Sequence, residues 1–235
     1  AYEMAPYQYD ETAFVSAMGL VAGICGRKFN VLGQGLNIYM TLIMGTGMGK
    51  DSIRKFVTKG LTANKLTNYG ELFLGPSRFT GPKSVRRSLE KTRSIVSVFT
   101  EAGLLLRSGS GDADGLTRSI LELYSTSGFG DRPGMEAFSS VDDSINAISS
   151  PSLSIINEAT PETLLSVFKD NQSLENGTIP RQSIFRVVVD RPGLNENLRI
   201  DLDKRHNDRL GELINLCHHY QDCECHENGG IVDII

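Results

Sequence analysis

A short segment of this chain combines three glycines and a lysine in the order that binds phosphate. Residues 44–51 read Met-Gly-Thr-Gly-Met-Gly-Lys-Asp. Glycines at alternate positions let the backbone turn its N–H groups around an anion, and the adjacent lysine can reach the β- and γ-phosphates of a nucleotide. The segment therefore predicts a phosphate-binding loop whose nucleotide contacts are Gly45, Thr46, Gly47, Met48, Gly49, Lys50, Asp51 and Ser52.

The flanking sequence predicts the strand and the helix that such a loop needs. Residues 38–43 form an apolar run typical of a buried strand, and residues 52–61 have the amphipathic period of a helix. The positive end of that helix would point at the anion, whereas Lys50 at its start would oppose the helix dipole if no anion were bound. The alternative is an ordinary turn between a strand and a helix.

The loop departs from the common pattern G-x-x-x-x-G-K-[ST] at two positions. Met44 replaces the first glycine, and Asp51 replaces the hydroxyl residue that binds Mg²⁺. A second apolar run, residues 94–101 with a strand expected over 95–100, ends in Thr100 and Glu101, where many P-loop ATPases have Asp-Glu. The carboxylate and the hydroxyl have thus exchanged places, and Mg²⁺ accepts oxygen ligands of both kinds, so Asp51 and Thr100 are the predicted metal ligands. The alternative is a degenerate site that binds nucleotide weakly or hydrolyses none.

Two further polar side chains follow predicted strands and turns. Asn157 ends the apolar run 151–157 and would contact the γ-phosphate or the attacking water, unless it only caps the turn before Thr160. Arg181 follows the turn at Gly177 and would reach the ATP of a neighbouring subunit, unless it is a solvated surface side chain. These positions are of interest because open α/β sheets bind their ligands at the carboxyl ends of the strands.

The N-terminal region predicts a helix that packs on the nucleotide-binding core. Residues 10–27 carry apolar side chains at helical spacing, and Asp10 is the expected N-cap. The expected buried face consists of Phe14, Met18, Val21, Ile24 and Cys25.

The rest of the chain alternates short apolar runs with helical patterns. Strands are expected at residues 72–74 and 183–190, a helix at 112–127, and irregular loops or a hairpin over 128–150. Strands that alternate with helices indicate an α/β fold with an open, mostly parallel sheet flanked by helices. We expect an N-terminal helical segment over 1–35, a P-loop ATPase core over 36–202 and a C-terminal helical tail over 203–235.

Composition is that of an ordinary globular chain. It has 235 residues, is 40% hydrophobic and 22% charged, and carries a net charge of −4. This charge provides no global basic field, so any contact with nucleic acid would have to be local. No apolar run approaches the roughly 18 residues of a membrane span, and no signal peptide is visible. Because the first residue is Ala1 and the last residues are apolar, we expect both ends to be cuts through a longer polypeptide.

Three of the four cysteines lie near the C-terminus among three histidines. These residues are Cys217, His218, His219, Cys223, Cys225 and His226. Cys and His close together suggest a metal site, but the spacing lacks the paired C-x-x-C knuckle of structural zinc sites. An exposed, reduced intracellular tail is therefore the favoured interpretation.

In order and spacing, several of these segments resemble the P-loop ATPase domain found with primases in phage and mobile-element replication proteins. That domain is related to RecA-like and superfamily-three ring helicases. The resemblance covers roughly residues 10–200 and is carried by residues 44–50, 98–103, 131–134, 151–162 and 177–181. It implies a RecA-like fold with ATP and Mg²⁺ as cofactors. By resemblance, Lys50 binds phosphate, Glu101 is the catalytic base, Asn157 is the sensor and Arg181 is the finger.

The resemblance implies an ATP-hydrolysing motor domain of a ring-shaped replicative DNA helicase from a phage or mobile element. Such a protein would form a homo-oligomeric ring, expected to be a hexamer, on single-stranded DNA in the cytoplasm of a bacterial host cell. Lys83, Arg86 and Arg87 form one local basic cluster that would suit DNA, although such clusters are often solvated helix faces.

Two other hypotheses remain open. One is a catalytically degenerate assembly module that oligomerises or recruits a primase or polymerase. The other is a P-loop kinase that acts on a small molecule. Turnover that single-stranded DNA stimulates would separate the motor from the assembly module, and phosphoryl transfer to a metabolite without DNA would identify the kinase.

Overall fold

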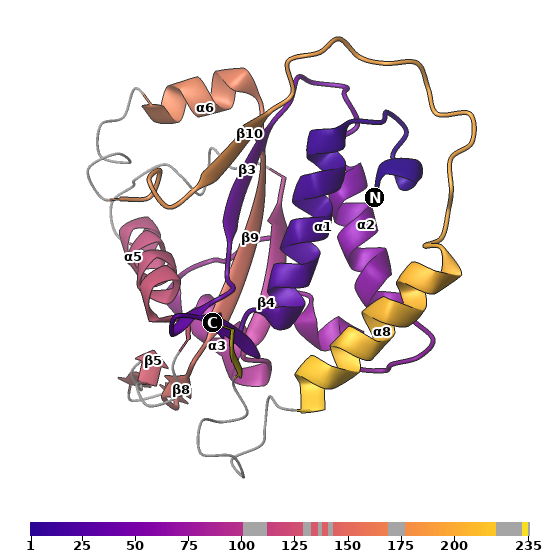
Figure 1. Cartoon of the computed structure of the whole chain (residues 1–235). Helices are drawn as coiled ribbons and strands as arrows, with labels where there is room; N and C mark the ends of the chain where they lie inside the picture. The colour runs from indigo at the N-terminus through magenta and orange to yellow at the C-terminus, as the bar shows by residue number, and fades with distance from the viewer. Residues whose placement is uncertain are drawn as a thin grey trace.

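Four apolar strands form the centre of the protein. The computed structural model describes residues 1–100, 112–128, 133–135, 138–140, 143–168, 177–219 and 232–234. The strands are β3 (Tyr39–Ile43), β4 (Ser94–Phe99), β9 (Ser152–Ala159) and β10 (Ser183–Arg186). They pair in the order β10-β3-β9-β4, and all three pairs are parallel (Figure 1). Every residue of β3, β4 and β9 is buried, as expected for strands covered on both faces. The expected α/β fold with a parallel sheet is therefore confirmed.

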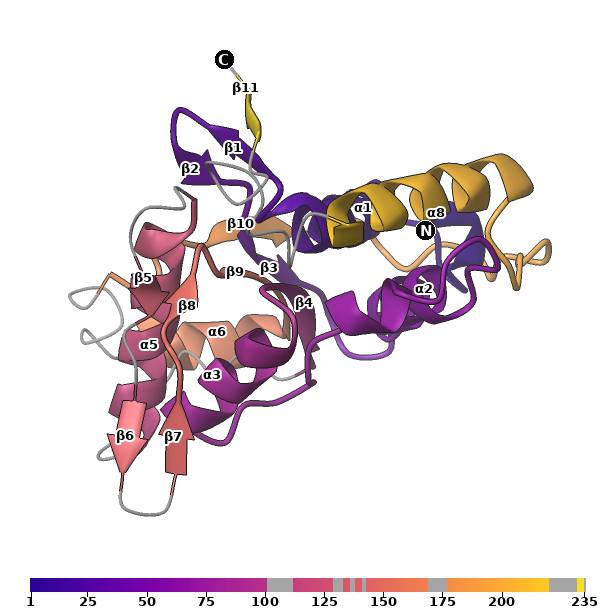
Figure 2. The same ribbon diagram turned by 90° about the horizontal axis from the view of Figure 1, so that it is seen from below.

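Helices cover both faces of this sheet (Figures 1 and 2). One face carries α1 (Asp10–Cys25), α2 (Ser52–Thr62) and α8 (Lys204–His219), and the other carries α3 (Pro82–Lys91), α5 (Asp112–Thr126) and α6 (Pro161–Phe168). The core on the α1 face joins Val15 of α1 and Ile214 of α8 to Met40 of β3. The expected N-terminal segment and C-terminal tail therefore contribute to the same core as the strands.

The connections between the strands define a particular place on the sheet. The chain leaves β3 and enters β4, which lies beyond β9, whereas it leaves β9 and enters β10, which lies beyond β3. Two neighbouring strands, β3 and β9, thus send their connections in opposite directions. In open α/β sheets this switch point, at the carboxyl ends of the strands, is where ligands bind.

Helix α1 packs on the sheet as expected, but with a different face. Ile24 and Cys25 are buried, whereas Phe14, Met18 and Val21 are 50%, 41% and 44% exposed. The expected apolar face of this helix is therefore wrong for three of its five residues.

Glycines explain which face of α1 is buried. A Cβ atom on Gly19 would lie 2.4 Å from Cδ1 of Ile156, and a Cβ atom on Gly23 would lie 2.4 Å from Cβ of Val96. Because these positions lack side chains, the helix backbone lies directly on the sheet. A prediction from hydrophobicity alone selects the larger apolar side chains as the buried face, because it does not count glycine as a packing residue.

Smaller elements complete the described chain. They are η1 (Tyr2–Met4), η2 (Gly70–Phe73), a sheet of β11 (Val232–Ile234), β1 (Phe29–Val31) and β2 (Gln34–Gly35), and two strand pairs, β5 (Pro133–Met135) with β8 (Ile148–Ser149) and β6 (Phe138–Ser140) with β7 (Asp143–Ile145). The β6–β7 pair confirms a hairpin within the stretch 128–150. None of the described helices combines the length and the hydropathy that crossing a membrane requires.

Three local expectations are wrong. The segment expected as a strand at 72–74 is mostly 3-10 helix, and only Leu74 bridges to β4. The strand expected over 183–190 ends at Arg186. The N-cap of α1 is Tyr9 and not Asp10, because Asp10 is already the first residue of the helix.

Candidate phosphate-binding site

The loop that follows β3 has the backbone form of an anion-binding nest. Gly47 and Gly49 have φ angles of 76° and 82°, in the left-handed region that favours glycine. The N–H groups of residues 46–51 donate no hydrogen bond within the chain as the structure describes it. The N–H of Gly45 donates to Sδ of Met48 at 3.2 Å, and a thioether is a weak acceptor. Successive N–H groups without acceptors, with left-handed residues among them, are characteristic of phosphate nests.

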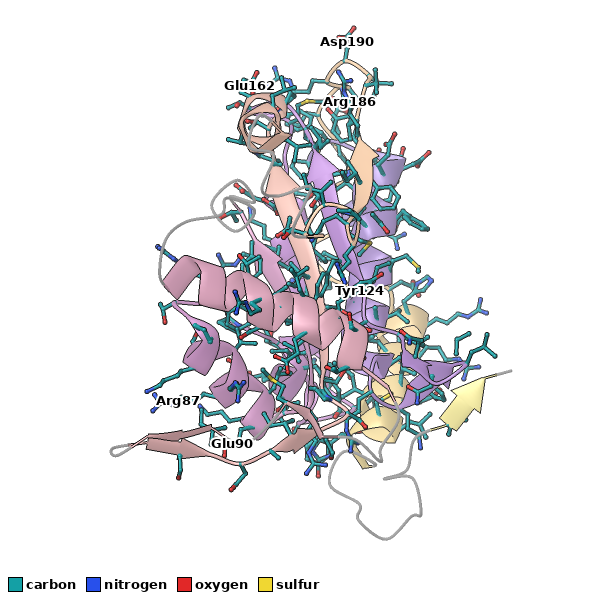
Figure 3. All side chains as sticks on the ribbon, turned by 90° about the vertical axis from the view of Figure 1, so that its left-hand side faces the viewer. Arg87, Glu90, Tyr124, Glu162, Arg186 and Asp190 are labelled. Carbon is teal, nitrogen blue, oxygen red and sulfur yellow. The ribbon has the colours of Figure 1, made fainter. Side chains whose placement is uncertain are left out.

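The position of the loop agrees with its geometry. The loop joins the carboxyl end of β3 to the start of α2, at the switch point between β3 and β9. In Figure 3, this end of the molecule is the one that carries the labelled residues Glu162, Arg186 and Asp190. Arg87 and Glu90 of α3 lie at the opposite end. The basic cluster that includes Arg87 therefore lies far from the loop.

The guanidinium group of Arg191, which belongs to the segment after β10, lies beside the loop. A Cβ atom on Gly49 would lie 3.1 Å from Cδ2 of Tyr7, and a Cβ atom on Gly47 would lie 3.8 Å from Nη1 of Arg191. The Arg191 guanidinium is 5.2 Å from the centre of the Tyr7 ring. An arginine this close to the loop backbone suits a phosphate, because its N–H groups form strong charge-assisted hydrogen bonds.

A backbone hydrogen bond and an ion pair hold the segment that carries Arg191. After β10 the chain passes over the top of the molecule to α8 (Figure 1). On the way, Asn195 donates its N–H to the carbonyl of Pro6 at 2.9 Å, and Arg199 pairs with Glu3 at 2.9 Å. Sequence reasoning missed Arg191, because nothing in its local sequence relates it to a loop that lies far away along the chain.

Glu158 of β9 is the second residue that sequence reasoning passed over. It pairs with Leu42 of β3 and is 1% exposed, and neither of its carboxyl oxygens has a hydrogen-bond partner among the described residues. Burial raises the pKa of Glu158 from 4.5 to about 8, and the charge of Asp51 adds to this rise while Lys50 and Arg54 oppose it. A buried carboxyl with a strongly raised pKa, close to a phosphate loop, is characteristic of a functional site.

The two predicted metal ligands border one cavity. Asp51 and Thr100 both line a cavity of about 770 Å³, which residues of α2 and the segment around Leu198 also line. Arg54 and Lys55 line the same cavity and form no ion pair in the described part of the chain. The carboxylate of Asp51 and the hydroxyl of Thr100 thus belong to residues that line the same cavity. Their role as metal ligands stays a prediction.

Thr100 lies immediately beyond β4, whose last residue, Phe99, pairs with Asn157 of β9. Thr100 is therefore next to the strand position of Glu158. The predicted catalytic base, Glu101, lies outside the described residues.

Asn157 is hydrogen-bonded to side chains of its own chain. Its Nδ2 donates to Oγ1 of Thr41 at 3.3 Å and to Oε1 of Gln182 at 3.2 Å, and the residue is fully buried. Because successive residues of a strand point to opposite faces, Asn157 faces the α5 side while Glu158 faces the α2 side. A sensor role for Asn157 stays a prediction, and Glu158 is the neighbour that faces the loop side.

Arg181 is engaged within its own chain. Its Nη1 donates to the carbonyl of Gly177 at 3.0 Å, and its guanidinium lies 5.9 Å from the centre of the Tyr124 ring. A role as a finger toward a neighbouring subunit would require this side chain to leave both contacts, and it stays a prediction.

The cysteine- and histidine-rich tail is described only at its start. Sγ of Cys217 lies 4.0 Å from Sγ of Cys25, both buried, and His218 stacks on Tyr69 with the ring centres 3.7 Å apart. Cys223, Cys225 and His226 lie outside the described residues.

Comparison with known proteins adds no relative. Neither a family model nor a curated protein sequence matches this chain. The function is therefore inferred from the residues of the chain and their arrangement.

Proposed function

We propose that this chain binds ATP through the loop between β3 and α2 and hydrolyses it. The observation that carries the proposal is the run of N–H groups over residues 46–51, without acceptors and shaped by Gly47 and Gly49. Lys50 and Arg191 bring positive charge to the same loop, one from its own sequence and one from the segment after β10. Together these groups suit the β- and γ-phosphates of a nucleotide.

The residues around the loop also suit Mg²⁺. Glu158 offers a buried carboxyl without a hydrogen-bond partner, Asp51 a second carboxyl and Thr100 a hydroxyl. Among the described residues there is no group of three or more His, Cys, Asp or Glu side chains that could hold a metal ion. Mg²⁺ at this place would neutralise the charge that develops on the phosphate oxygens. Lys50 would bind the phosphates, and Glu101 would take the proton of the attacking water.

We further propose that ATP turnover drives a ring on single-stranded DNA, with Arg181 acting on the ATP of the neighbouring subunit. This part of the proposal rests on the resemblance to replicative ring ATPases described above. The alternative is the assembly module, and one group of contacts favours it. Asn157, Arg181 and the N–H of Gly45 are all engaged within the chain itself.

The first experiment tests nucleotide binding alone. Lys50→Ala should lose binding of a fluorescent ATP analogue in an equilibrium titration, because the loop loses the lysine aimed at the phosphates. Lys65→Ala removes an exposed lysine after α2 and should bind as tightly as the wild type. Equal affinity of the wild type and Lys50→Ala would show that residues 44–51 are an ordinary turn.

The second experiment separates the motor from the assembly module. ATP turnover is measured with and without single-stranded DNA, and the mass of the protein in solution is measured with and without ATP. Stimulation by DNA together with a ring-sized assembly supports the motor. Assembly without turnover under any condition supports the module.

A further inference from the structure

The carboxyl group of Glu158 lies at an unusual place for an acid. Glu158 is in β9, the strand between β3 and β4, and its neighbours along the strand are also buried. Both carboxyl oxygens are inaccessible and have no hydrogen-bond partner. A polar group buried in this way costs free energy unless another group compensates for it. The buried carboxyl of Glu158 therefore requires a compensating group.

The cationic side chains near Glu158 do not compensate for its buried carboxyl. Lys50 and Arg54 are the positive groups whose fields reach Glu158, yet neither lies within ion-pair distance of it. Asp51 also acts on Glu158, and it is a like charge. The two carboxyl groups are thus close enough for the charge of Asp51 to act on Glu158, and no cation of the described residues forms an ion pair with either. A bound metal ion stabilises such an arrangement.

We propose that Glu158 is a ligand of the divalent cation that accompanies the bound nucleotide, and that it shares this ion with Asp51. The proposal rests on the proposed function, because the phosphates complete the coordination. Mg²⁺ fits the chemistry, since it takes oxygen ligands and usually has one or two carboxylates together with phosphate and water. Neither cysteine nor histidine is part of this group.

With Glu158 as a ligand, the metal site differs from the one predicted from Asp51 and Thr100 alone. Thr100 and Asp51 exchange the usual hydroxyl and carboxylate, and Glu158 adds a carboxylate from the strand that lies between those two positions. Asp51, which shares the ion in this assignment, also lines the cavity beside α2. Together with Asp51, Glu158 gives the site two carboxylates, one more than the usual pair of a hydroxyl and a carboxylate supplies.

Equilibrium binding tests this assignment without any measurement of turnover. The affinity for a fluorescent ATP analogue is measured in EDTA and again in Mg²⁺, for the wild type, Glu158→Gln and Glu162→Gln. Glu162 is an exposed acid in the first turn of α6, so its variant is a matched control for loss of one carboxylate. Thermal unfolding checks that every variant is folded, and the amide of glutamine preserves the shape of residue 158.

The wild type and Glu162→Gln should bind the analogue more tightly in Mg²⁺ than in EDTA. Glu158→Gln should bind as the wild type does in EDTA, but its gain from Mg²⁺ should fall by about 10-fold or more, since even indirect partners of a metal contribute about 10–100-fold to its affinity. An undiminished gain in Glu158→Gln overturns the assignment, as does an equal loss in Glu162→Gln. Weaker binding of Glu158→Gln in EDTA also overturns it, because the residue would then act on the nucleotide. A wild type that binds no analogue in either buffer refutes the proposed function itself.

Discussion

Replacing Glu158 by glutamine should make the protein more stable at neutral and alkaline pH. Burial raises the pKa of this carboxyl from 4.5 to about 8, so between these pH values the folded protein holds a proton that the unfolded chain has released. The stability due to this proton is fully present below about pH 4.5, falls as the pH rises, and is lost above about pH 8. Glutamine carries no titrating group, so Glu158→Gln should lack this fall.

The size of the effect follows from the two pKa values. Each pH unit in this window costs about 1.4 kcal/mol of the free energy of unfolding. Relative to acid pH, the wild type should therefore lose on the order of 3 kcal/mol by pH 7 and roughly 5 kcal/mol by pH 9. Such losses are large beside the roughly 5–15 kcal/mol that stabilises a typical domain.

Urea unfolding followed by circular dichroism measures this difference directly. The free energy of unfolding is determined at pH 5, 7 and 9 for the wild type, Glu158→Gln and the exposed control Glu162→Gln, without metal or nucleotide. The wild type and the control should lose stability together as the pH rises, while Glu158→Gln should lose far less. Parallel curves for all three proteins would refute the reasoning, because they would show that Glu158 ionises as freely in the folded protein as in the unfolded chain.

Three further outcomes are expected. Gly23→Ala should destabilise the protein by about 1–3 kcal/mol in urea unfolding, because the new methyl group forces α1 away from the sheet, whereas Gly193→Ala, with no atom within 4 Å of its added carbon, should change little. Arg191→Ala should weaken equilibrium binding of ATP about tenfold or more, because a hydrogen bond to a charged group contributes about 1.5–3 kcal/mol, and unchanged affinity would contradict its place at the loop. Lys50→Ala and Arg181→Ala should each abolish ATP turnover but regain some activity when mixed, since an arginine supplied in trans contributes about 10³–10⁵ to the rate. A mixture of exchanging subunits that stays inactive would argue against a shared site.

Local sequence patterns determined the part of the site that depends on neighbouring residues. The apolar run before the loop became the fully buried strand β3, because a strand covered on both faces tolerates few polar side chains. The alternate glycines of the loop adopted positive φ at Gly47 and Gly49, a conformation that glycine reaches without strain. Backbone preference and hydrophobic periodicity act over a few residues, so the sequence alone contains this information.

Packing decided which face of α1 is buried. The helical period was correct, but the bulky residues Phe14, Met18 and Val21 are exposed, and Gly19 and Gly23 lie on the sheet. A hydrophobic pattern measures what a side chain gains from burial and not how closely two backbones can approach. Only glycine, which has no side chain, lets the backbone of a helix lie directly on a sheet. This advantage exists only once the sheet has formed.

Tertiary structure alone brought Glu158 and Arg191 to the loop between β3 and α2. As a polar residue at the end of an apolar strand, Glu158 looked no different from its neighbour Asn157, and only the pleat of β9 directs the two to opposite faces. Arg191 reaches Gly47 because the segment after β10 is fastened to the N-terminus of the chain. The electrostatics of the site depend on burial and on distances between remote segments, and those quantities exist only once the sheet has formed.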